Sequence, residues 1–296
     1  MNNMYFLGID GGGTKCKARL EDHSGKLLAE SVAGPANPSR DYDTAIESIV
    51  KAISTVFEAA NLPQQSVKNT HAVIGLAGLN IENCLHKMQE WGHPFASLQL
   101  TTDLHIACVG AHAQEEGAIV IIGTGSSALV CKNHYKHELG GHGFLLGDKA
   151  SGAWFGKQSI SLLLESVDGI IESSPFLRFL NQHIECDNAN DVVQKYLSAV
   201  PAEFAKLAPE VFHFAEQEDV HAIALVRQAA AYIEKLCEQI REFKPCRLAF
   251  IGGLSEKLIP WLNEELVEQI SPAINSPEAG AILIARQQHS IGKKLA

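Results

Sequence analysis

Three glycine-rich turns each follow a short apolar segment and could hold the phosphates and ribose of a nucleotide. The turns are Asp10-Gly11-Gly12-Gly13-Thr14, Gly123-Thr124-Gly125-Ser126 and Gly252-Gly253. Glycine lets the backbone turn tightly and approach a ligand closely, and successive N–H groups can form a nest for phosphate oxygens. One such turn alone would favour an ordinary hairpin. Three of them in this arrangement form a specific constellation that predicts nucleotide binding.

Side chains in these turns could complete a site for Mg²⁺ and ATP. Asp10 follows an apolar strand, where its carboxylate could hold Mg²⁺ through water, since Mg²⁺ keeps part of its hydration shell. The pair Gly252-Gly253 lacks side chains, so adenine and ribose could lie against the backbone there. The predicted ATP-binding residues are Gly12, Gly13, Thr14, Lys15, Thr124, Gly125, Gly252 and Gly253.

Other nucleotide-binding signatures are absent from the sequence. No G-x-x-x-x-G-K-[ST] segment occurs, which excludes a P-loop enzyme. No G-x-G-x-x-G follows the first strand, which disfavours a Rossmann dehydrogenase, and the protein-kinase H-R-D and D-F-G signatures are missing too.

The hydrophobic pattern predicts the elements that position these turns. Residues 4–9, 15–20 and 27–32 predict three strands joined by tight turns, and Asp41 predicts the N-cap of a helix that reaches about residue 61. A second strand–turn–strand unit covers residues 118–131. The repetition of the strand–turn–strand unit indicates an approximate internal duplication, and two unrelated hairpins are the alternative explanation.

Most of the remaining chain is predicted to be helical. Apolar residues at steps of three and four predict a long amphipathic helix over residues 223–240, ended by Pro245. Residues 248–251 predict a buried strand, and a final helix begins near Pro277.

Composition limits the classes of partner. The 296 residues suffice for two domains, and the 46% hydrophobic content supplies a well-packed core. A net charge of -10 disfavours nucleic acid, although it could attract a cationic sugar. The N-terminus lacks a basic signal-peptide region and no apolar run approaches the length of a membrane span, so we expect a cytoplasmic protein without a membrane partner. Seven cysteines without a CxxC pair predict reduced, mostly buried thiols.

Several segments resemble the sugar kinase/Hsp70/actin clan. FLGIDGGGTK is similar to its first phosphate motif, IIGTGSSA to the second, LAFIGGLSEKL to the adenosine motif, and SPEAGAILIA to the segment that opens its C-terminal helix. Within the clan the chain most resembles the N-acetylglucosamine kinase-like, BadF-type ATPases, and among them the bacterial glucosamine kinases. The resemblance implies an α/β fold of two actin-like (ribonuclease H-like) lobes with a nucleotide/sugar cleft. Residues 1–116, completed by about 280–296, would form one lobe and residues 117–279 the other.

The resemblance also implies the residues that would act on a sugar. Asp103 matches the Asp that accepts the proton of the acceptor hydroxyl, here the 6-hydroxyl, although an Asp at that point could equally cap a helix. Asn37 matches a sugar-contacting Asn, with an ordinary Asn-Pro turn as the alternative. The segment GGHGFLLGDKASGAWFG matches the sugar-binding loop and supplies Gly141, His142, Gly143 and Asp148.

Departures from the family pattern bear on which sugar is bound. Members often read Gly-Asp-Glu-Gly-Ser where this chain has Lys149 and Ala150, and small residues where it has Leu104 and His105. His142 occupies the position of the Trp in the Gly-Trp-Gly segment typical of the human-type enzymes. Because His is smaller and more polar than Trp, it could suit a sugar with a free amine. We therefore expect ATP- and Mg²⁺-dependent phosphorylation of an amino sugar, with glucosamine ahead of N-acetylglucosamine.

Two other functions fit the same fold. The activator ATPases of 2-hydroxyacyl-CoA dehydratases share the ATP motifs but need thiolates for a bridging iron–sulfur cluster. Cys131 lies beside the second glycine turn, yet residues 140–156 contain no cysteine. A non-catalytic sugar sensor would carry a helix-turn-helix segment before the first strand. A homodimer is usual for the relatives that the chain resembles.

Overall fold

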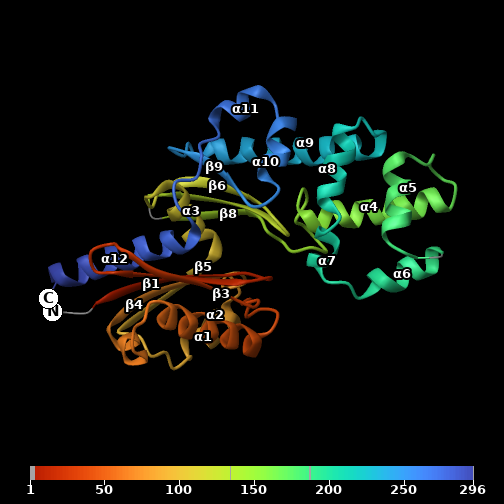
Figure 1. Ribbon diagram of the computed structural model, residues 1–296. Helices are drawn as coiled ribbons and strands as arrows, with labels where there is room; N and C mark the ends of the chain where they lie inside the picture. Colours follow the sequence, from red (N-terminus) through yellow and green to blue (C-terminus); the bar gives the residue numbers. More distant parts are fainter. Residues whose placement is uncertain (1–3, 134, 187, 296) are drawn as a thin grey trace. The chain divides into compact units, whose positions relative to one another are not determined.

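The computed structural model describes residues 4–133, 135–186 and 188–295, and the chain divides into two compact units (Figure 1). The first unit comprises Met1–Gly117, Cys131–Lys136 and Pro272–Ala296. The second comprises Ala118–Val130 and His137–Ser271. A five-stranded β-sheet belongs to the first unit and a four-stranded β-sheet is associated with the second, and helices pack on both sheets. This arrangement confirms the predicted α/β class.

The sheet of the first unit has five strands in the order β3-β2-β1-β4-β5. The strands are β1 (Tyr5–Gly11), β2 (Cys16–Asp22), β3 (Leu27–Ala33), β4 (Thr70–Leu76) and β5 (Ser97–Thr102). The helices are α1 (Tyr42–Ala59), the 3-10 helix η1 (Gln64–Asn69), α2 (Glu82–Gln89), α3 (Asp103–His112) and α12 (Pro277–Leu295). Antiparallel pairing continues to Gly11 opposite Cys16, so Asp10 lies inside β1 and not in the turn that the sequence predicted.

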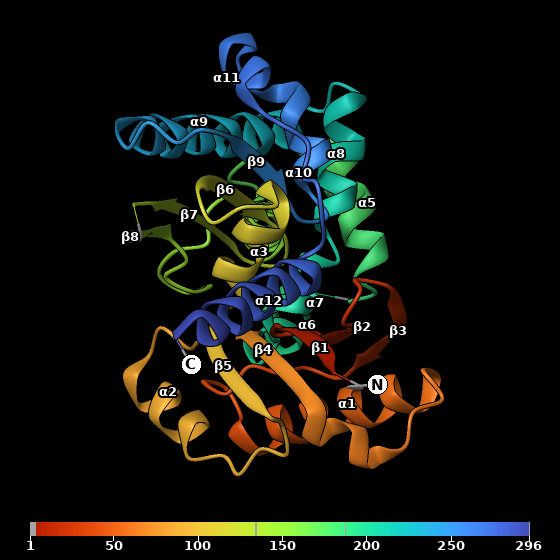
Figure 2. The ribbon, with the colours of Figure 1, turned by 90° about the vertical axis from the view of Figure 1, so that its left-hand side faces the viewer.

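The two faces of this sheet carry separate hydrophobic cores because side chains alternate along each strand. Tyr5, Leu7 and Ile9 of β1 point to the face that α1 covers. Phe6 points to the opposite face, where it packs with side chains of α3 and α12. Figures 1 and 2 show α1 and α12 on opposite sides of the five strands. Gly8 and Asp10 follow Phe6 at steps of two, so they also lie on the α12 face.

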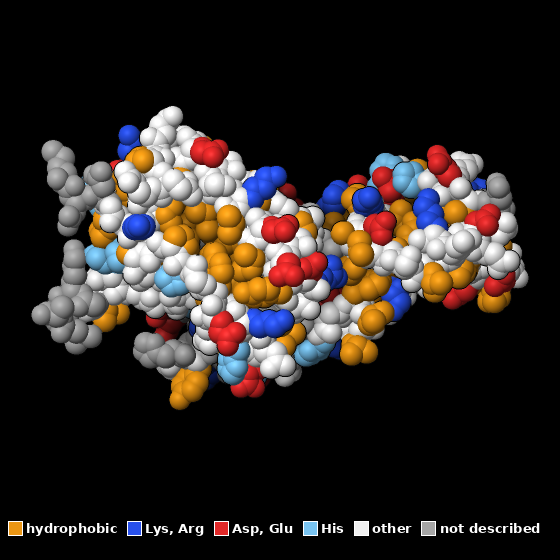
Figure 3. All heavy atoms as spheres, turned by 90° about the horizontal axis from the view of Figure 1, so that it is seen from below, with side chains coloured by type: hydrophobic (Ala, Val, Ile, Leu, Met, Phe, Trp, Pro, Cys, Tyr) orange, Lys and Arg blue, Asp and Glu red, His pale blue; other side chains and the backbone are white. Residues whose placement is uncertain are grey.

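Helix α1 begins at the predicted cap. Asp41 Oδ1 accepts a hydrogen bond from Thr44 N at 3.0 Å, and Oδ2 accepts one from Thr44 Oγ1 at 2.9 Å. Buried residues at steps of three and four, among them Ile49 and Val56, face the sheet. The surface on the side of α1 and α2 carries hydrophobic side chains among charged ones (Figure 3).

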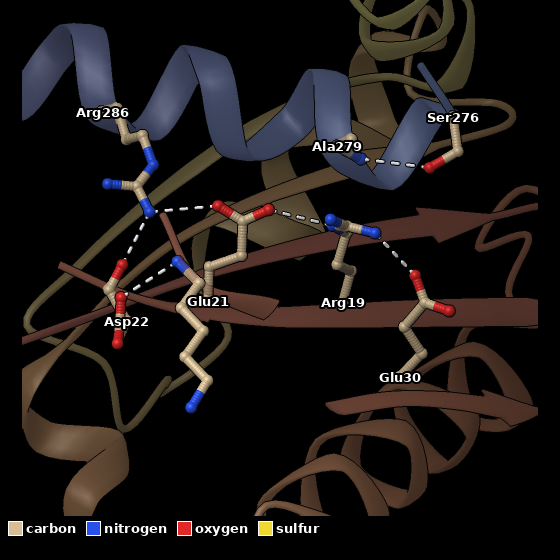
Figure 4. A network of polar contacts seen from close by, with 8 residues as sticks. Arg19, Glu21, Asp22, Glu30, Ser276, Ala279 and Arg286 are labelled. Atoms are coloured by element: carbon tan, nitrogen blue, oxygen red, sulfur yellow. Dashed lines mark hydrogen bonds and ion pairs between the residues drawn. The ribbon is translucent and has the colours of Figure 1, made fainter. Parts of the chain in front are cut away.

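An ion-pair network fixes α12 to β2 (Figure 4). Arg286 of α12 donates through Nη2 to Glu21 Oε2 at 3.0 Å and to the carbonyl oxygen of Asp22 at 2.6 Å. Glu21 Oε1 accepts from Arg19 Nε at 3.0 Å, and Arg19 Nη1 donates to Glu30 at 2.8 Å. Glu21 is only 8% exposed, and its two arginine partners compensate for the burial of its charge.

The sheet associated with the second unit has four strands in the order β8-β7-β6-β9. The strands are β6 (Gly117–Ile122), β7 (Ser126–Lys132), β8 (Tyr135–Gly140) and β9 (Leu248–Ile251). Strands β6 and β9 are parallel, as β1 and β4 are in the first sheet. In both sheets, the strand that precedes a glycine turn (β1 or β6) pairs with a parallel strand from later in the chain (β4 or β9). This shared pattern is what an internal duplication would produce.

Helices supply most of the second unit. They are α4 (Gly152–Val167), α5 (Pro175–His183), α6 (Ala189–Leu197), α7 (Pro201–Ala205), α8 (Ala208–Glu216), α9 (Val220–Glu242), α10 (Ser255–Leu258), the 3-10 helix η2 (Ile259–Trp261) and α11 (Glu264–Gln269). Phe155 of α4 and Phe212 of α8 meet edge to face at 5.0 Å in its core.

The cysteines confirm the prediction of free, mostly buried thiols. All seven cysteines are free thiols, and four of them are buried. Among the described residues, no helix is both long and apolar enough to cross a membrane.

Candidate active site

A cluster of charged side chains surrounds Asp10 in the first unit. Asp10 lies opposite Lys17 on β2 and Gly75 on β4. Burial, and then the carboxylates of Asp103 and Glu278, raise the pKa of Asp10 to about 7, although Lys17 and Lys15 act in the opposite direction. This cluster of carboxylates would be stabilised by a cation.

The turn after β1 is held by backbone hydrogen bonds at its base and is open at its tip. Gly12 N donates to the carbonyl oxygen of Lys15 at 3.0 Å, so this N–H closes the turn and does not join the predicted phosphate nest. Gly13, Thr14 and Lys15 form the tip of the turn and are exposed, so their hydrogen-bond donors are accessible to a ligand. A side-chain Cβ at Gly13 would lie 3.8 Å from Arg40 Nη1. Arg40 is therefore a cationic residue near the turn that the sequence analysis missed.

Asp103 begins α3, directly after β5. Thr102 is the N-cap, since its hydroxyl accepts from His105 N at 3.2 Å, so the interpretation of Asp103 as the cap is wrong. Asp103 Oδ1 accepts from Leu104 N at 2.9 Å. The carboxylate is partly exposed in the first turn of α3. An ionised carboxylate in this position can accept a proton.

His105, one of the departures from the family pattern, lies one residue beyond Leu104 and is 8% exposed. Its Nδ1 atom lies 2.9 Å from Thr101 Oγ1 and 3.0 Å from Lys136 Nζ. Burial, and then the Lys136 ammonium, lower the pKa of His105 from 6.5 to about 4. The neutral ring can accept a hydrogen bond from the ammonium, which ties Lys136 to the start of α3 within the first unit.

We expect His105 to make the protein less stable in acid. The unfolded chain protonates this ring below its ordinary pKa and the folded chain only near pH 4, so stability falls as the pH decreases between these values. At about pH 5, this effect lowers the free energy of unfolding by about 2 kcal/mol relative to neutral pH. Urea unfolding at about pH 7.5 and 5 should show a smaller acid loss in His105→Asn than in wild type. Equal losses in both proteins would contradict this assignment.

Asn37 adopts the turn that was the alternative to sugar contact. Its Oδ1 atom accepts from Ser39 N at 3.0 Å and from Ser39 Oγ at 2.7 Å. Asn37 also lies beside Gly78, where an added Cβ would come within 2.8 Å of the same oxygen. Contact with a sugar remains a prediction for this residue.

In the second unit, the turn after β6 lies against the predicted sugar-binding segment. Gly152 N donates to the carbonyl oxygen of Gly123 at 2.7 Å, and Ala153 N to that of Thr124 at 3.1 Å. A Cβ added to Gly125 would lie 3.0 Å from Asp148 Oδ2. Thr124, Gly125 and Asp148 are thus brought together, a proximity that the sequence did not predict.

The segment that contains the predicted sugar ligands has unusual backbone conformations. Gly141 and Gly143 have φ values of 70° and 82°, and the non-glycine residues Asp148 and Ala150 have 51° and 71°. Left-handed conformations of non-glycine residues cost about 1–3 kcal/mol each and cluster at ligand sites. His142 is exposed on this segment. Lys149 points its ammonium toward the ring of Tyr232 in α9, 5.8 Å from the centroid.

The glycine pair after β9 borders a cavity of about 560 Å³. Gly252 has a φ of 105°, and a Cβ there would lie 2.4 Å from the carbonyl oxygen of Ile122, so this position requires glycine. Gly253 lines the cavity and has open space around it. The other lining residues are Glu216, Glu256, Lys257, Pro260 and Trp261. The sequence pattern did not indicate these residues, although Pro260 and Trp261 follow the glycine pair closely.

The described residues hold no group of three or more His, Cys, Asp or Glu side chains arranged to ligate a metal. Mg²⁺ generally keeps several of its waters and is held by one or two carboxylates plus substrate phosphates.

Comparison with known proteins identifies relatives along nearly the whole chain. The sequence profile of the BadF/BadG/BcrA/BcrD ATPase family matches residues 7–285. Glucosamine kinase GspK of Vibrio cholerae is 32% identical over 290 residues, which cover 98% of each chain. The N-acetyl-D-glucosamine kinase of Dictyostelium discoideum is 24% identical over 320 residues, covering 96% of this chain and 98% of its own. The crystal structure of a candidate N-acetylglucosamine kinase from Chromobacterium violaceum superposes with a TM-score of 0.90 at 29% identity, covering 96% of this chain and all of that one.

Proposed function

The chain belongs to the BadF/BadG/BcrA/BcrD ATPase family, and we propose that it is an ATP-dependent amino-sugar kinase that converts glucosamine to glucosamine 6-phosphate. The choice of glucosamine as the sugar is supported mainly by the full-length similarity to a glucosamine kinase. The acid cluster around Asp10, the position of Asp103 and the cavity beside Gly253 support phosphoryl transfer from ATP.

Asp103 acts as the general base in this proposal. Its carboxylate accepts the proton of the sugar 6-hydroxyl as that oxygen bonds to the γ-phosphorus. The bond from the γ-phosphorus to the bridging oxygen breaks, and its electron pair leaves with ADP. In the first unit, Thr14 and Lys15 are the proposed phosphate-binding residues. In the second unit, Thr124 and Gly125 are the proposed phosphate-binding residues, and the cavity beside Gly253 is the proposed adenosine site.

The residues around Asp10 fit a magnesium ion. Carboxylate oxygens are the ligands that Mg²⁺ prefers, and the pKa of Asp10 is raised by burial first and then by the carboxylates of Asp103 and Glu278, which a cation would offset. When bound, the ion neutralises phosphate charge. Asp10 would hold it through water.

A coupled assay of ADP release tests this function. The panel is glucosamine, N-acetylglucosamine, glucose, N-acetylmannosamine and no sugar. We expect ADP release to depend strongly on glucosamine. Sugar-independent hydrolysis, or no turnover with any sugar, would reject an amino-sugar kinase and favour an activator ATPase. Preference for N-acetylglucosamine would support the second candidate, which the Dictyostelium discoideum relative favours.

His142 is proposed to set the preference between the free and the acetylated amine. It is exposed on the sugar segment, and a larger apolar ring at this position would favour an acetamide. We expect His142→Trp to shift the ratio of kcat/KM for glucosamine over N-acetylglucosamine about tenfold toward N-acetylglucosamine. His183→Trp, at the end of α5, is the control. An unchanged ratio in His142→Trp would count against this role.

A further inference from the structure

Helix α12 brings a second carboxylate to the face of β1 that carries Asp10. Gly8 precedes Asp10 by two residues and points to the same face. A Cβ at Gly8 would lie 2.0 Å from the backbone oxygen of Glu278, so the first turn of α12 lies directly against this part of the strand. Lys17, the cross-strand partner of Asp10, has its Nζ atom 3.5 Å from Glu278 Oε1. Lys17 therefore joins the two carboxylates into one cluster.

The charge of Glu278 is incompletely compensated. The residue is 5% exposed, and within the described part of the chain its Oε2 atom is buried without a hydrogen-bond partner. The one ion pair that Glu278 makes there, with Lys17, is longer than a good hydrogen bond, and the Lys17 side chain is 39% exposed. A buried carboxylate oxygen without a partner is costly, so a ligand that supplies positive charge or donors would relieve it.

We propose that Glu278 completes the divalent-cation site of Asp10, accepting hydrogen bonds from the water shell of the ion through Oε2. The inference rests on the proposed function, since phosphoryl transfer from ATP brings the ion to this cluster. Mg²⁺ usually keeps several waters and is held through one or two carboxylates plus substrate phosphates, so two carboxylates suit a hydrated ion. Lys17 then competes with the ion for the same carboxylates.

The test measures cation binding without catalysis. Mn²⁺ binding is followed by electron paramagnetic resonance in the presence of a non-hydrolysable ATP analogue and without sugar. We expect Glu278→Gln to weaken Mn²⁺ binding about 10- to 100-fold, the usual effect of removing an outer-shell partner. Glu47→Gln, an exposed change on α1, is the matched control and should bind as wild type does.

Lys17→Met tests the proposal without altering Glu278. Removal of the competing ammonium should leave Mn²⁺ binding at least as tight as in wild type. Equal weakening in Lys17→Met and Glu278→Gln would show that Glu278 acts only through Lys17 and would overturn the proposal. Unchanged binding in Glu278→Gln, with sugar-dependent activity intact, would overturn it and leave the proposed function standing. Absence of Mn²⁺–nucleotide binding in wild type would reject both.

Discussion

Asp103→Asn should reduce the kcat for sugar phosphorylation about 10²- to 10⁴-fold, the usual contribution of a general base. The amide can still accept the hydrogen bond from Leu104 N, and Thr102 still caps α3, so the fold should be unchanged. The amide cannot accept the proton of the acceptor hydroxyl at neutral pH. The loss should therefore appear in kcat, measured by coupled ADP release, with the KM values for sugar and ATP much less affected.

Asp43→Asn is the matched control for this change. Asp43 is exposed in the first turn of α1, so this variant loses the same charge from the same unit. We expect it to retain the kcat of wild type. If Asp103→Asn kept more than about a tenth of the wild-type kcat, another group would have to accept the proton.

Gly8→Ala should destabilise the protein by about 3 kcal/mol, at the upper end of the usual cost of overpacking. The added Cβ would lie 2.0 Å from the backbone oxygen of Glu278 and 3.0 Å from Ala281 Cβ. A backbone atom inside a helix cannot move aside without moving α12. Thermal unfolding followed by circular dichroism should show a melting temperature lower by about 5–10 °C.

Gly92→Ala provides the comparison for Gly8→Ala. A Cβ at Gly92 would meet no atom within 4 Å, and the residue is exposed. Its melting temperature should stay within about 2 °C of wild type. A similar loss in both variants would indicate a general effect of adding a methyl group, and would contradict a close contact between β1 and α12.

The sequence predicted features that are set by local interactions. The strands before the glycine turns, the cap at Asp41 and the long helix α9 all depend on nearby residues, and they are confirmed. The family suggested by the motifs is confirmed by the family profile. Residue types alone could not decide which of two adjacent residues caps α3, because both Thr102 and Asp103 are good caps.

Features that depend on distant contacts could not be predicted in this way. Glu278 approaches Asp10 only because α12 returns to β1 from the far end of the chain. The left-handed conformation of Asp148 is maintained by the surrounding fold, since isolated non-glycine residues rarely adopt it. Strand β8 is largely exposed and lacks an alternating pattern, which left its sequence without a strand signal.

The discontinuity of the first unit has a consequence for synthesis on the ribosome. Phe6, Val73 and Ile106 are covered on one face by Ala281 and Ile282 of α12, which is translated after the whole second unit. Domains generally fold as they emerge, so the second unit can complete its core while this face of the nascent first sheet still awaits its cover. During that interval the apolar face would stay uncovered, and a ribosome stalled before α12 would leave it exposed.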